Sequence, residues 1–125
     1  MLDNCSLSFS EAFVAIATQQ LKQQTQFYSA AFSCTPAVSA PTYSEFRLSG
    51  LKLALFVPGD RHQQTFQAPS SGPMSLCVEV DDLEAAIAHL TKLGYPPPGE
   101  IITASHGQEI YAYDLDGNRL ILHQS

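Results

Sequence analysis

Two side chains on predicted strands, Cys77 and His123, are of the types that form a nucleophilic pair. An imidazole within hydrogen-bond reach of a thiol removes its proton and leaves a reactive thiolate. The simpler alternative is that Cys77 is a small apolar residue of a strand and that His123 lies in solvent. Buried cysteines behave mostly as inert apolar residues, so the sequence favours this simpler alternative.

Three carboxylates, those of Glu45, Glu79 and Glu109, fall within predicted strands and have three alternative uses. A dry cleft would raise the pKa of one of them and make it a general base. They could instead bind a cationic ligand, or form ion pairs with basic residues of neighbouring strands. The basic candidates are Arg47, Lys52 and Arg119. Cross-strand pairing is the use that the sequence favours.

The remaining histidines are spread over different kinds of segment. His62 lies in a predicted loop, His89 in a predicted helix and His106 in a predicted turn beside a glycine. Their spacing indicates no metal-binding triad. His106 would lie at the rim of any cleft, where a contact with a ligand stays open. Residues 61–67, with Phe66, form either a flap over such a cleft or a simple linker.

Size and composition favour one globular domain. Of the 125 residues, 45% are hydrophobic and 14% are charged, which permits a core of its own. The net charge of −6 argues against nucleic acid and against an anionic membrane surface as partners. No apolar run is long enough to span a membrane, and no signal peptide is visible. Three cysteines without CxxC spacing favour reduced thiols, so we expect a cytoplasmic protein.

Hydrophobic periodicity predicts two helices and a series of short strands. Strands are predicted at 13–17, 42–48, 51–57, 75–80 and 101–102, and an edge strand is possible between Pro36 and Pro41. Helices are predicted at about 21–32 and 83–93. Either Asp81 or Asp82 caps the second helix, with Glu84 completing a capping box after Asp81, and Gly94 ends it. Residues 58–73 lack periodicity and predict a linker loop.

The last two predicted strands form a hairpin around residues 114–118. An Asp-Gly pair between apolar, aromatic-rich runs is a strong hairpin signal, and Gly117 can adopt the positive φ that such a turn needs. On the strand that follows, Leu120 and Leu122 would share one face with the core. The opposite face comprises Arg119, Ile121 and His123.

The order strand, helix, strands occurs twice, which is an internal repeat. Phe13 and Ser75 are 62 positions apart, and Ala54 and Ile121 are 67 apart at the closing strands. Each half has one helix for one sheet face, so the fold class is α+β. The predicted division is a first module at about 11–58, a linker at 59–73 and a second module at about 74–124.

One helix covers only one face of a sheet, so the two remaining faces would line a shared groove. A concave surface that mixes aromatic and charged side chains is typical of a small-ligand site, although each of these residues could equally lie on an ordinary solvent face. The predicted ligand-binding residues are Phe13, Tyr43, Glu45, Arg47, Phe56, Cys77, Glu79, Glu109, Tyr111, Tyr113, Arg119 and His123.

The chain resembles the vicinal oxygen chelate superfamily, which includes glyoxalase I, the bleomycin and fosfomycin resistance proteins and the extradiol dioxygenases. The resemblance rests on the repeat, on Val-Asp-Asp-Leu-Glu-Ala-Ala at 80–86, on His106-Gly107 and on Asp-Leu-Asp-Gly-Asn at 114–118. It covers about residues 13–123. It implies paired βαβββ modules that curl a mostly antiparallel sheet around a central cleft, and a homodimer. Whether the modules pair within one chain or swap across a dimer stays open.

Enzymes of this superfamily hold a divalent metal on the first and last strands of each module. Carried over to this chain, the ligand positions are Phe13, Ala54, Ser75 and Ile121. Three of these side chains cannot bind a metal, and a lone serine is a poor ligand. We therefore expect no metal and no other cofactor, which argues against glyoxalase I, fosfomycin-modifying and dioxygenase activity.

The resulting hypothesis is a metal-independent protein that binds a small organic molecule in its cleft, similar in kind to the bleomycin resistance proteins, rather than an enzyme. One alternative is a lyase or isomerase, without metal or with an atypical metal site, that uses a cleft carboxylate. Another is a structural or regulatory dimer with a vestigial cleft. The sequence identifies neither the ligand nor any catalytic residue.

Overall fold

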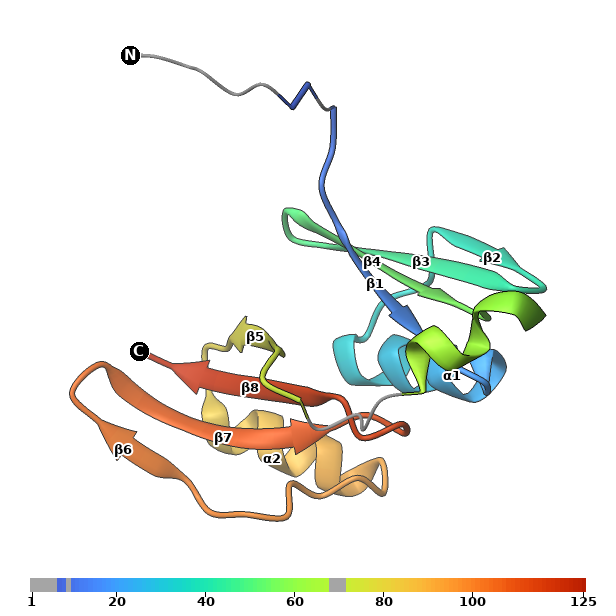
Figure 1. Ribbon diagram of the computed structural model, residues 1–125. Coiled ribbons are helices and arrows are strands. Elements are labelled where there is room, and N and C mark those ends of the chain that lie inside the picture. The colour runs from blue at the N-terminus through green and yellow to red at the C-terminus, as the bar shows by residue number, and fades with distance from the viewer. Residues whose placement is uncertain (1–6, 9, 68–71) are drawn as a thin grey trace.

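The computed structural model describes residues 7–8, 10–67 and 72–125 (Figure 1). Module 1 contains β1 (Val14–Ala17), α1 (Leu21–Phe32), β2 (Val38–Ala40), β3 (Tyr43–Leu48) and β4 (Leu51–Phe56). The 3-10 helix η1 (Asp60–Phe66) follows it. Module 2 contains β5 (Ser75–Glu79), α2 (Leu83–Lys92), β6 (Ile102–Ala104), β7 (Gly107–Tyr113) and β8 (Arg119–Gln124).

Each module is a four-stranded mixed sheet with one helix. The strand orders are β1-β4-β3-β2 and β5-β8-β7-β6, so the two sheets have the same topology. In each sheet the first strand pairs in parallel with the last, and the other neighbours are antiparallel. This is the α+β fold of two βαβββ modules that the sequence predicts, with two separate sheets that do not close.

The internal repeat is reproduced in the strand register. Ala15 lies opposite Ala54 in module 1, and Cys77 lies opposite Ile121 in module 2. These pairs keep the offsets of 62 and 67 seen in the sequence, and α1 and α2 begin at Leu21 and Leu83. The extra residues of module 2 therefore lie between its helix and its last strand.

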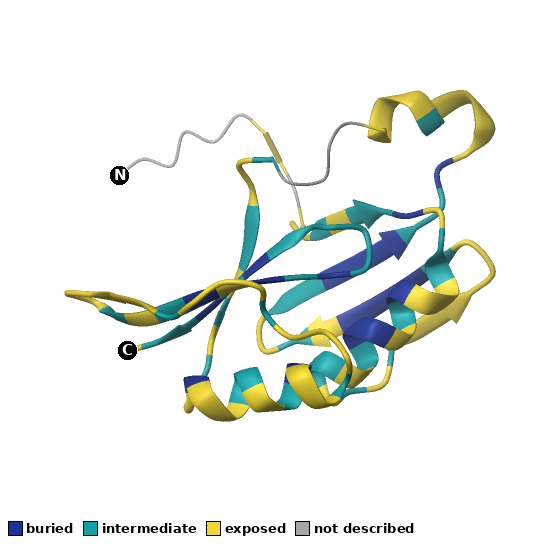
Figure 2. Ribbon diagram, turned by 90° about the horizontal axis from the view of Figure 1, so that it is seen from below, coloured by how far each residue is buried: buried dark blue, intermediate teal, exposed yellow. Residues whose placement is uncertain are grey.

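The core lies between each helix and the sheet face it covers (Figure 2). In module 1, Phe27 and Tyr28 of α1 pack against Phe46, Leu53 and Leu55 of the sheet. In module 2 the corresponding residues are Leu83, Leu90, Ile110, Ala112, Leu120 and Leu122. Alternation along β8 puts Leu120 and Leu122 into this core, as predicted.

The two modules meet where α1 contacts the turn between β7 and β8. The Tyr28 hydroxyl donates a 2.6 Å hydrogen bond to Asp114, and the side-chain amides of Gln20 and Gln24 donate to Asp116. The Gln24 carbonyl oxygen accepts from the backbone N–H of Leu115. Gln24 is completely buried, so this polar contact belongs to the interior of the molecule.

Two local predictions differ from the structure. Part of the predicted linker loop forms the 3-10 helix η1, and Gly59, the residue before this helix, has an extended backbone. Residues 68–71 of the predicted linker lie outside the described residues. The cap of α2 is Asp82, whose carboxylate accepts from the Ala85 N–H. Because the cap is Asp82, the third helical residue is Ala85, and the predicted Asp81–Glu84 capping box does not form. Gly94 ends the helix region with a φ of 97°, as predicted.

Candidate functional site

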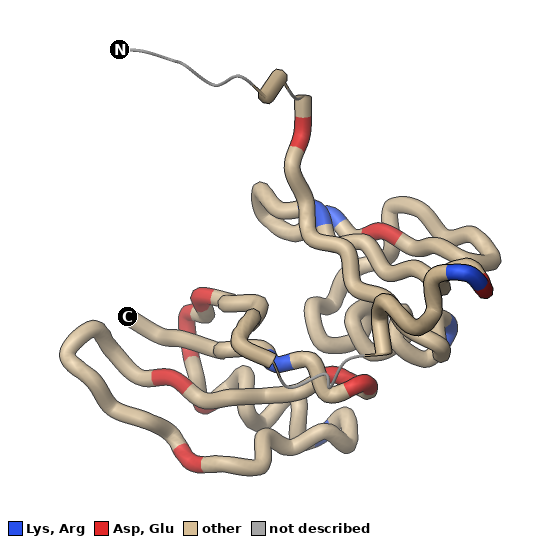
Figure 3. Tube along the Cα trace, in the orientation of Figure 1, with Lys and Arg blue, Asp and Glu red and all other residues tan. Residues whose placement is uncertain are grey.

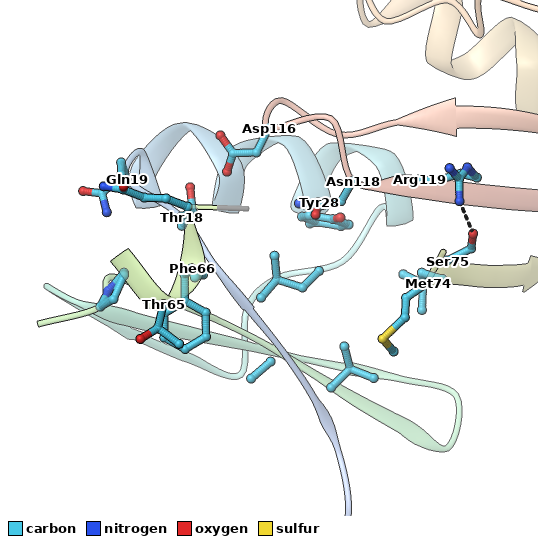
Figure 4. A pocket seen from close by; sticks show the side chains of 17 residues that line it. Thr18, Gln19, Tyr28, Thr65, Phe66, Met74, Ser75, Asp116, Asn118 and Arg119 are labelled. Atoms are coloured by element: carbon cyan, nitrogen blue, oxygen red, sulfur yellow. Dashed lines mark hydrogen bonds between the residues drawn. The ribbon is translucent and has the colours of Figure 1, made fainter. Parts of the chain in front are cut away.

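A cavity of about 810 Å³ lies between the modules, beside the edge strands β1 and β5 (Figure 4). Its apolar lining includes Val14, Ile16 and Leu76, and Phe66 of η1 closes one side. The polar side chains around it include Thr18, Gln19, Thr65, Ser75, Asp116, Asn118 and Arg119. A mostly apolar cavity of this size with a few polar groups is typical of small-molecule sites.

Arg119 supplies the positive charge of this cavity. Its Nη1 donates to the carbonyl of Gly72 at 2.9 Å and to the Ser75 hydroxyl at 3.1 Å. A guanidinium has five N–H donors, and among the described residues the recorded bonds of this side chain all come from Nη1. The remaining N–H groups are available for an acceptor on a ligand.

Asp116, the carboxylate in the cavity lining, has both oxygens engaged. Oδ1 accepts from Gln20 at 2.7 Å and Oδ2 accepts from Gln24 at 3.0 Å. The Asp116 carboxylate therefore binds the β7–β8 turn to α1. This leaves Arg119 as the charged group of the lining that can bind a ligand.

Part of the predicted flap covers the sheet of module 1. Phe66 packs edge-on against Phe56, with ring centroids 5.2 Å apart, while it also lines the cavity. Phe56 itself lies on the sheet face away from α1. The segment 61–67 thus contacts both the cavity and a residue predicted to bind ligand.

The other predicted site residues of module 1 bind one another on the face away from the helix. The buried Glu45 carboxylate accepts from the Tyr43 hydroxyl at 2.9 Å and pairs with Arg47 at 3.1 Å and with Lys52 at 3.9 Å. The bond to Glu45 raises the pKa of Tyr43. Lys52 Nζ also lies 4.0 Å from the centre of the Phe13 ring. The predicted cross-strand pairing is therefore present between Glu45 of β3 and Lys52 of β4, whereas the Glu45–Arg47 ion pair lies along β3 itself.

In module 2 the predicted pairing is different. Glu79 binds His123 rather than a basic residue, with 2.6 Å between Glu79 Oε1 and His123 Nδ1. Its other oxygen accepts from the backbone N–H and hydroxyl of Ser125, at 2.8 and 2.7 Å. The bonds from Ser125, followed by those from His123, lower the pKa of Glu79. The prediction of a Glu79 or Glu109 pair with Arg119 is wrong, since Arg119 binds Gly72 and Ser75.

The Cys77–His123 pair, the alternative that the sequence did not favour, does not form. Cys77 is exposed and lies opposite Ile121, two residues along the strands from the Glu79–His123 pair. Both nitrogens of His123 are occupied, because Nε2 lies 2.9 Å from Nδ1 of His106. His123 is accordingly a partly buried member of a polar cluster and not a solvated terminal residue.

Sequence reasoning missed this cluster of His106, Glu109 and His123, whose ligand-type atoms lie within 4.8 Å of one another. Glu109 and His123 are opposite each other on β7 and β8, and His106 comes from the turn that leads into β7. The strand register could have revealed the Glu109–His123 pair. The position of His106 depends on the path of that turn, which the sequence did not predict.

The remaining predicted residues, Tyr111 and Tyr113, lie on the same face of module 2 as Glu109 and His123, with Tyr111 exposed. Of the twelve predicted ligand-binding residues, Arg119 is the one that lines the cavity between the modules. The others lie on the helix-free faces of the two sheets. Their role in binding stays a prediction.

Two βαβββ modules with a cavity between them define the structural class of this protein. Comparison with known proteins identifies the superfamily. The model of the Glyoxalase/Bleomycin resistance protein/Dioxygenase superfamily matches residues 12–122. The chain belongs to this superfamily. None of the curated proteins matches this sequence significantly.

Solved structures show the same fold. A protein from Agrobacterium tumefaciens, solved by NMR in solution, is 26% identical, with a TM-score of 0.74 and coverage of 90% of this chain and 93% of that one. The fosfomycin resistance protein FosX from Listeria monocytogenes is 16% identical, with a TM-score of 0.74 and 95% coverage of both chains. The bleomycin resistance determinant of transposon Tn5 is 17% identical, with a TM-score of 0.69 and coverage of 94% and 98%.

The usual metal positions of the superfamily do not fit a metal in this chain. Ala54 is completely buried beside Ala15, and Ile121 lies opposite Cys77. Phe13 stacks under Lys52, and the Ser75 hydroxyl accepts a bond from Arg119. This donor set has one weak oxygen ligand and no imidazole or carboxylate.

Proposed function

We propose that the protein binds a small organic molecule in the cavity between its modules. The observation that carries this proposal is the cavity itself, with an apolar wall from β1 and β5 and the free donors of Arg119 at its edge. A ligand with an apolar body and a carboxylate, sulfonate or similar acceptor group matches that lining. Of the superfamily's usual metal positions, Ser75 lines this cavity, and its hydroxyl accepts a bond from Arg119.

The strand edges around the cavity add to this support. β1 and β5 each lie at one end of their sheet, so along one edge of each strand the backbone N–H and C=O groups face no other strand of the described residues. These groups give a ligand polar contacts that need no particular side chain. They also offer a surface for a second copy of the chain, and we propose a homodimer on this basis.

The probe 8-anilinonaphthalene-1-sulfonate has aromatic rings and one sulfonate, and it tests the site directly. We expect saturable binding of one probe per chain. Arg119→Gln should weaken it about tenfold or more, because a hydrogen bond to a charged group is lost. Ala15→Phe, which places a ring beside the cavity, should also weaken it. Lys92→Gln removes an exposed cation of α2 and serves as the matched control.

Unchanged affinity in both Arg119→Gln and Ala15→Phe, with folding intact by circular dichroism, would show that the cavity is not the binding site. Native mass spectrometry of the protein as purified gives the natural ligand's mass from any organic adduct. The same spectrum reports whether the main species is a dimer of the 13.6 kDa chain. A monomer without adduct and without probe binding would contradict the proposal.

Among the described residues, none of the helices is long and apolar enough to cross a lipid bilayer. Cys34 and Cys77 are free thiols. On the basis of these thiols we propose a cytoplasmic location, which imaging of a fluorescent fusion protein would test.

A further inference from the structure

We propose that His106, Glu109 and His123 bind one divalent transition-metal ion of the Zn²⁺ type, at a position that differs from the superfamily's usual metal site. The three residues provide two imidazole nitrogens and one carboxylate with ligand atoms within 4.8 Å of one another. None of them lines the cavity between the modules, so the inference goes beyond the proposed binding of an organic molecule and is independent of it.

The fold brings the three ligands together by strand pairing and by one turn. Glu109 and His123 are opposite each other on β7 and β8, so their side chains lie on the same face of the sheet. The turn before β7 then brings His106 over the end of β8, where its ring stacks on that of His123 with 5.0 Å between centroids.

Gly107 permits this approach. Its φ is 132°, and a Cβ at this position would collide with the backbone carbonyl of Gln124. A residue with a side chain would therefore push the turn away from β8 and separate His106 from His123. A glycine directly after His106 is therefore needed for the contact between His106 and His123, and not only for the shape of the turn.

Glu79 prepares His123 as a ligand. Its carboxylate accepts the Nδ1–H of His123 at 2.6 Å, which fixes the imidazole tautomer and directs the Nε2 lone pair toward His106, its hydrogen-bond partner, and Glu109. Both Glu79 oxygens are engaged, by His123 and by Ser125, so Glu79 is a positioning residue and not a ligand. A carboxylate behind a metal-binding histidine is a regular feature of metal sites.

The distances require little adjustment for an ion to enter. His106 Nδ1 and His123 Nε2 lie 2.9 Å apart and share a proton in the metal-free form. Two nitrogens on a tetrahedral zinc ion, at ordinary bond lengths, lie about 3.4 Å apart. A separation larger by about half an ångström is within the reach of small side-chain rotations, since His106 is exposed.

Ligand type and charge indicate which ions fit. Imidazole favours Zn²⁺ and similar ions over Mg²⁺ and Ca²⁺, which prefer sites made of oxygen ligands. Eight of the twelve acidic residues of the chain lie in module 2, which makes this module the more negative one (Figure 3). Three protein ligands leave a coordination position open for water or another ligand, in contrast to a closed structural site.

Co²⁺ titration of the full chain tests the inference, because tetrahedrally bound Co²⁺ has visible d–d bands. We expect one Co²⁺ per chain, displaced by Zn²⁺. His106→Ala, Glu109→Gln and His123→Ala should each weaken binding at least about tenfold, and Glu79→Gln by about 10- to 100-fold. His62→Ala removes an exposed histidine of η1 and should bind like the wild type.

Wild-type protein that shows no saturable Co²⁺ band overturns the proposal. So does a His106→Ala/His123→Ala variant that binds Co²⁺ as tightly as wild type, since the ion would then lie elsewhere. His106 is exposed, so the single His106→Ala variant keeps the test valid even if substitutions at the partly buried His123 impair folding. Circular dichroism of each variant separates a lost metal site from a lost fold.

Discussion

Asp114 illustrates how much of this structure depends on single polar side chains. Its Oδ1 accepts from the backbone N–H groups of Asp116 and Asn118, both at 2.9 Å, which shapes the β7–β8 turn. Its Oδ2 accepts from the Asn118 amide and from the Tyr28 hydroxyl of α1. One buried carboxylate therefore stabilises a turn in module 2 and binds it to the helix of module 1.

Tyr28→Phe should lower the free energy of unfolding by about 1.5–3 kcal/mol near neutral pH, because a buried hydrogen bond to a carboxylate is lost. Burial, and then the charge of Asp114, raises the pKa of Tyr28 well above its ordinary value. The hydroxyl thus stays protonated in the folded state but ionises in the unfolded state above about pH 10. The stabilising effect is complete below that pH and declines as pH rises further.

Urea unfolding of wild type and Tyr28→Phe measures both effects, near neutral pH and again above pH 10. The advantage of the wild type should shrink in the alkaline series. An advantage that is the same at both pH values would mean that the pKa of Tyr28 is not raised. The Tyr43 hydroxyl, which binds Glu45, is present in both proteins and cancels from the comparison.

The elements were largely predictable because each has a local cause. Alternating apolar residues and an Asp-Gly turn specify the β7–β8 hairpin, and Gly117 has a φ of 84° there. The register of the β3–β4 hairpin follows from its Ser49-Gly50 turn, so the pairing of Glu45 with Lys52 across the two strands could be predicted from the sequence. These predictions depend on residues that are close in the chain.

The parts of the site that were not predicted depend on distant residues. His106 contacts His123 only because the turn before β7 folds over β8, and Glu79 binds His123 through the parallel pairing of β5 with β8. The cavity depends on how the two modules sit against each other. No local sequence pattern predicts any of these three features. For this reason, of the twelve predicted ligand-binding residues, Arg119 alone is in the lining of this cavity.

The N-terminus of α2 gives a prediction at the scale of an element. Asp82 accepts from the Ala85 N–H at 3.1 Å, so Asp82→Ala should lower the free energy of unfolding by about 1 kcal/mol. Asp81 precedes the cap and is exposed. Its alanine variant should differ from wild type by less than about 0.5 kcal/mol in urea unfolding. Equal losses for both variants would mean that charge near the helix end matters and not the cap.

At the scale of the whole molecule, polar contacts join the two modules beside the apolar core to which both contribute. Gln24 and Gln20 bind the β7–β8 turn, Tyr28 binds Asp114, and the His89 ring of α2 donates to the Ala30 carbonyl of α1 at 2.9 Å. Such contacts are directional, so they fix the orientation of one module on the other more narrowly than apolar packing alone. The shape of the cavity between the modules follows from that orientation.

Gln24→Ala tests this role of the junction. Gln24 is fully buried and bonds both to Asp116 and to the Leu115 N–H, so its removal leaves a buried donor unsatisfied and costs about 2–4 kcal/mol of unfolding free energy. Gln23→Ala, on the exposed side of the same helix, should cost less than about 0.5 kcal/mol. If Gln24 orients the modules, its loss also weakens binding of the anilinonaphthalene probe, whereas a purely local effect would lower stability and leave probe affinity at the wild-type value.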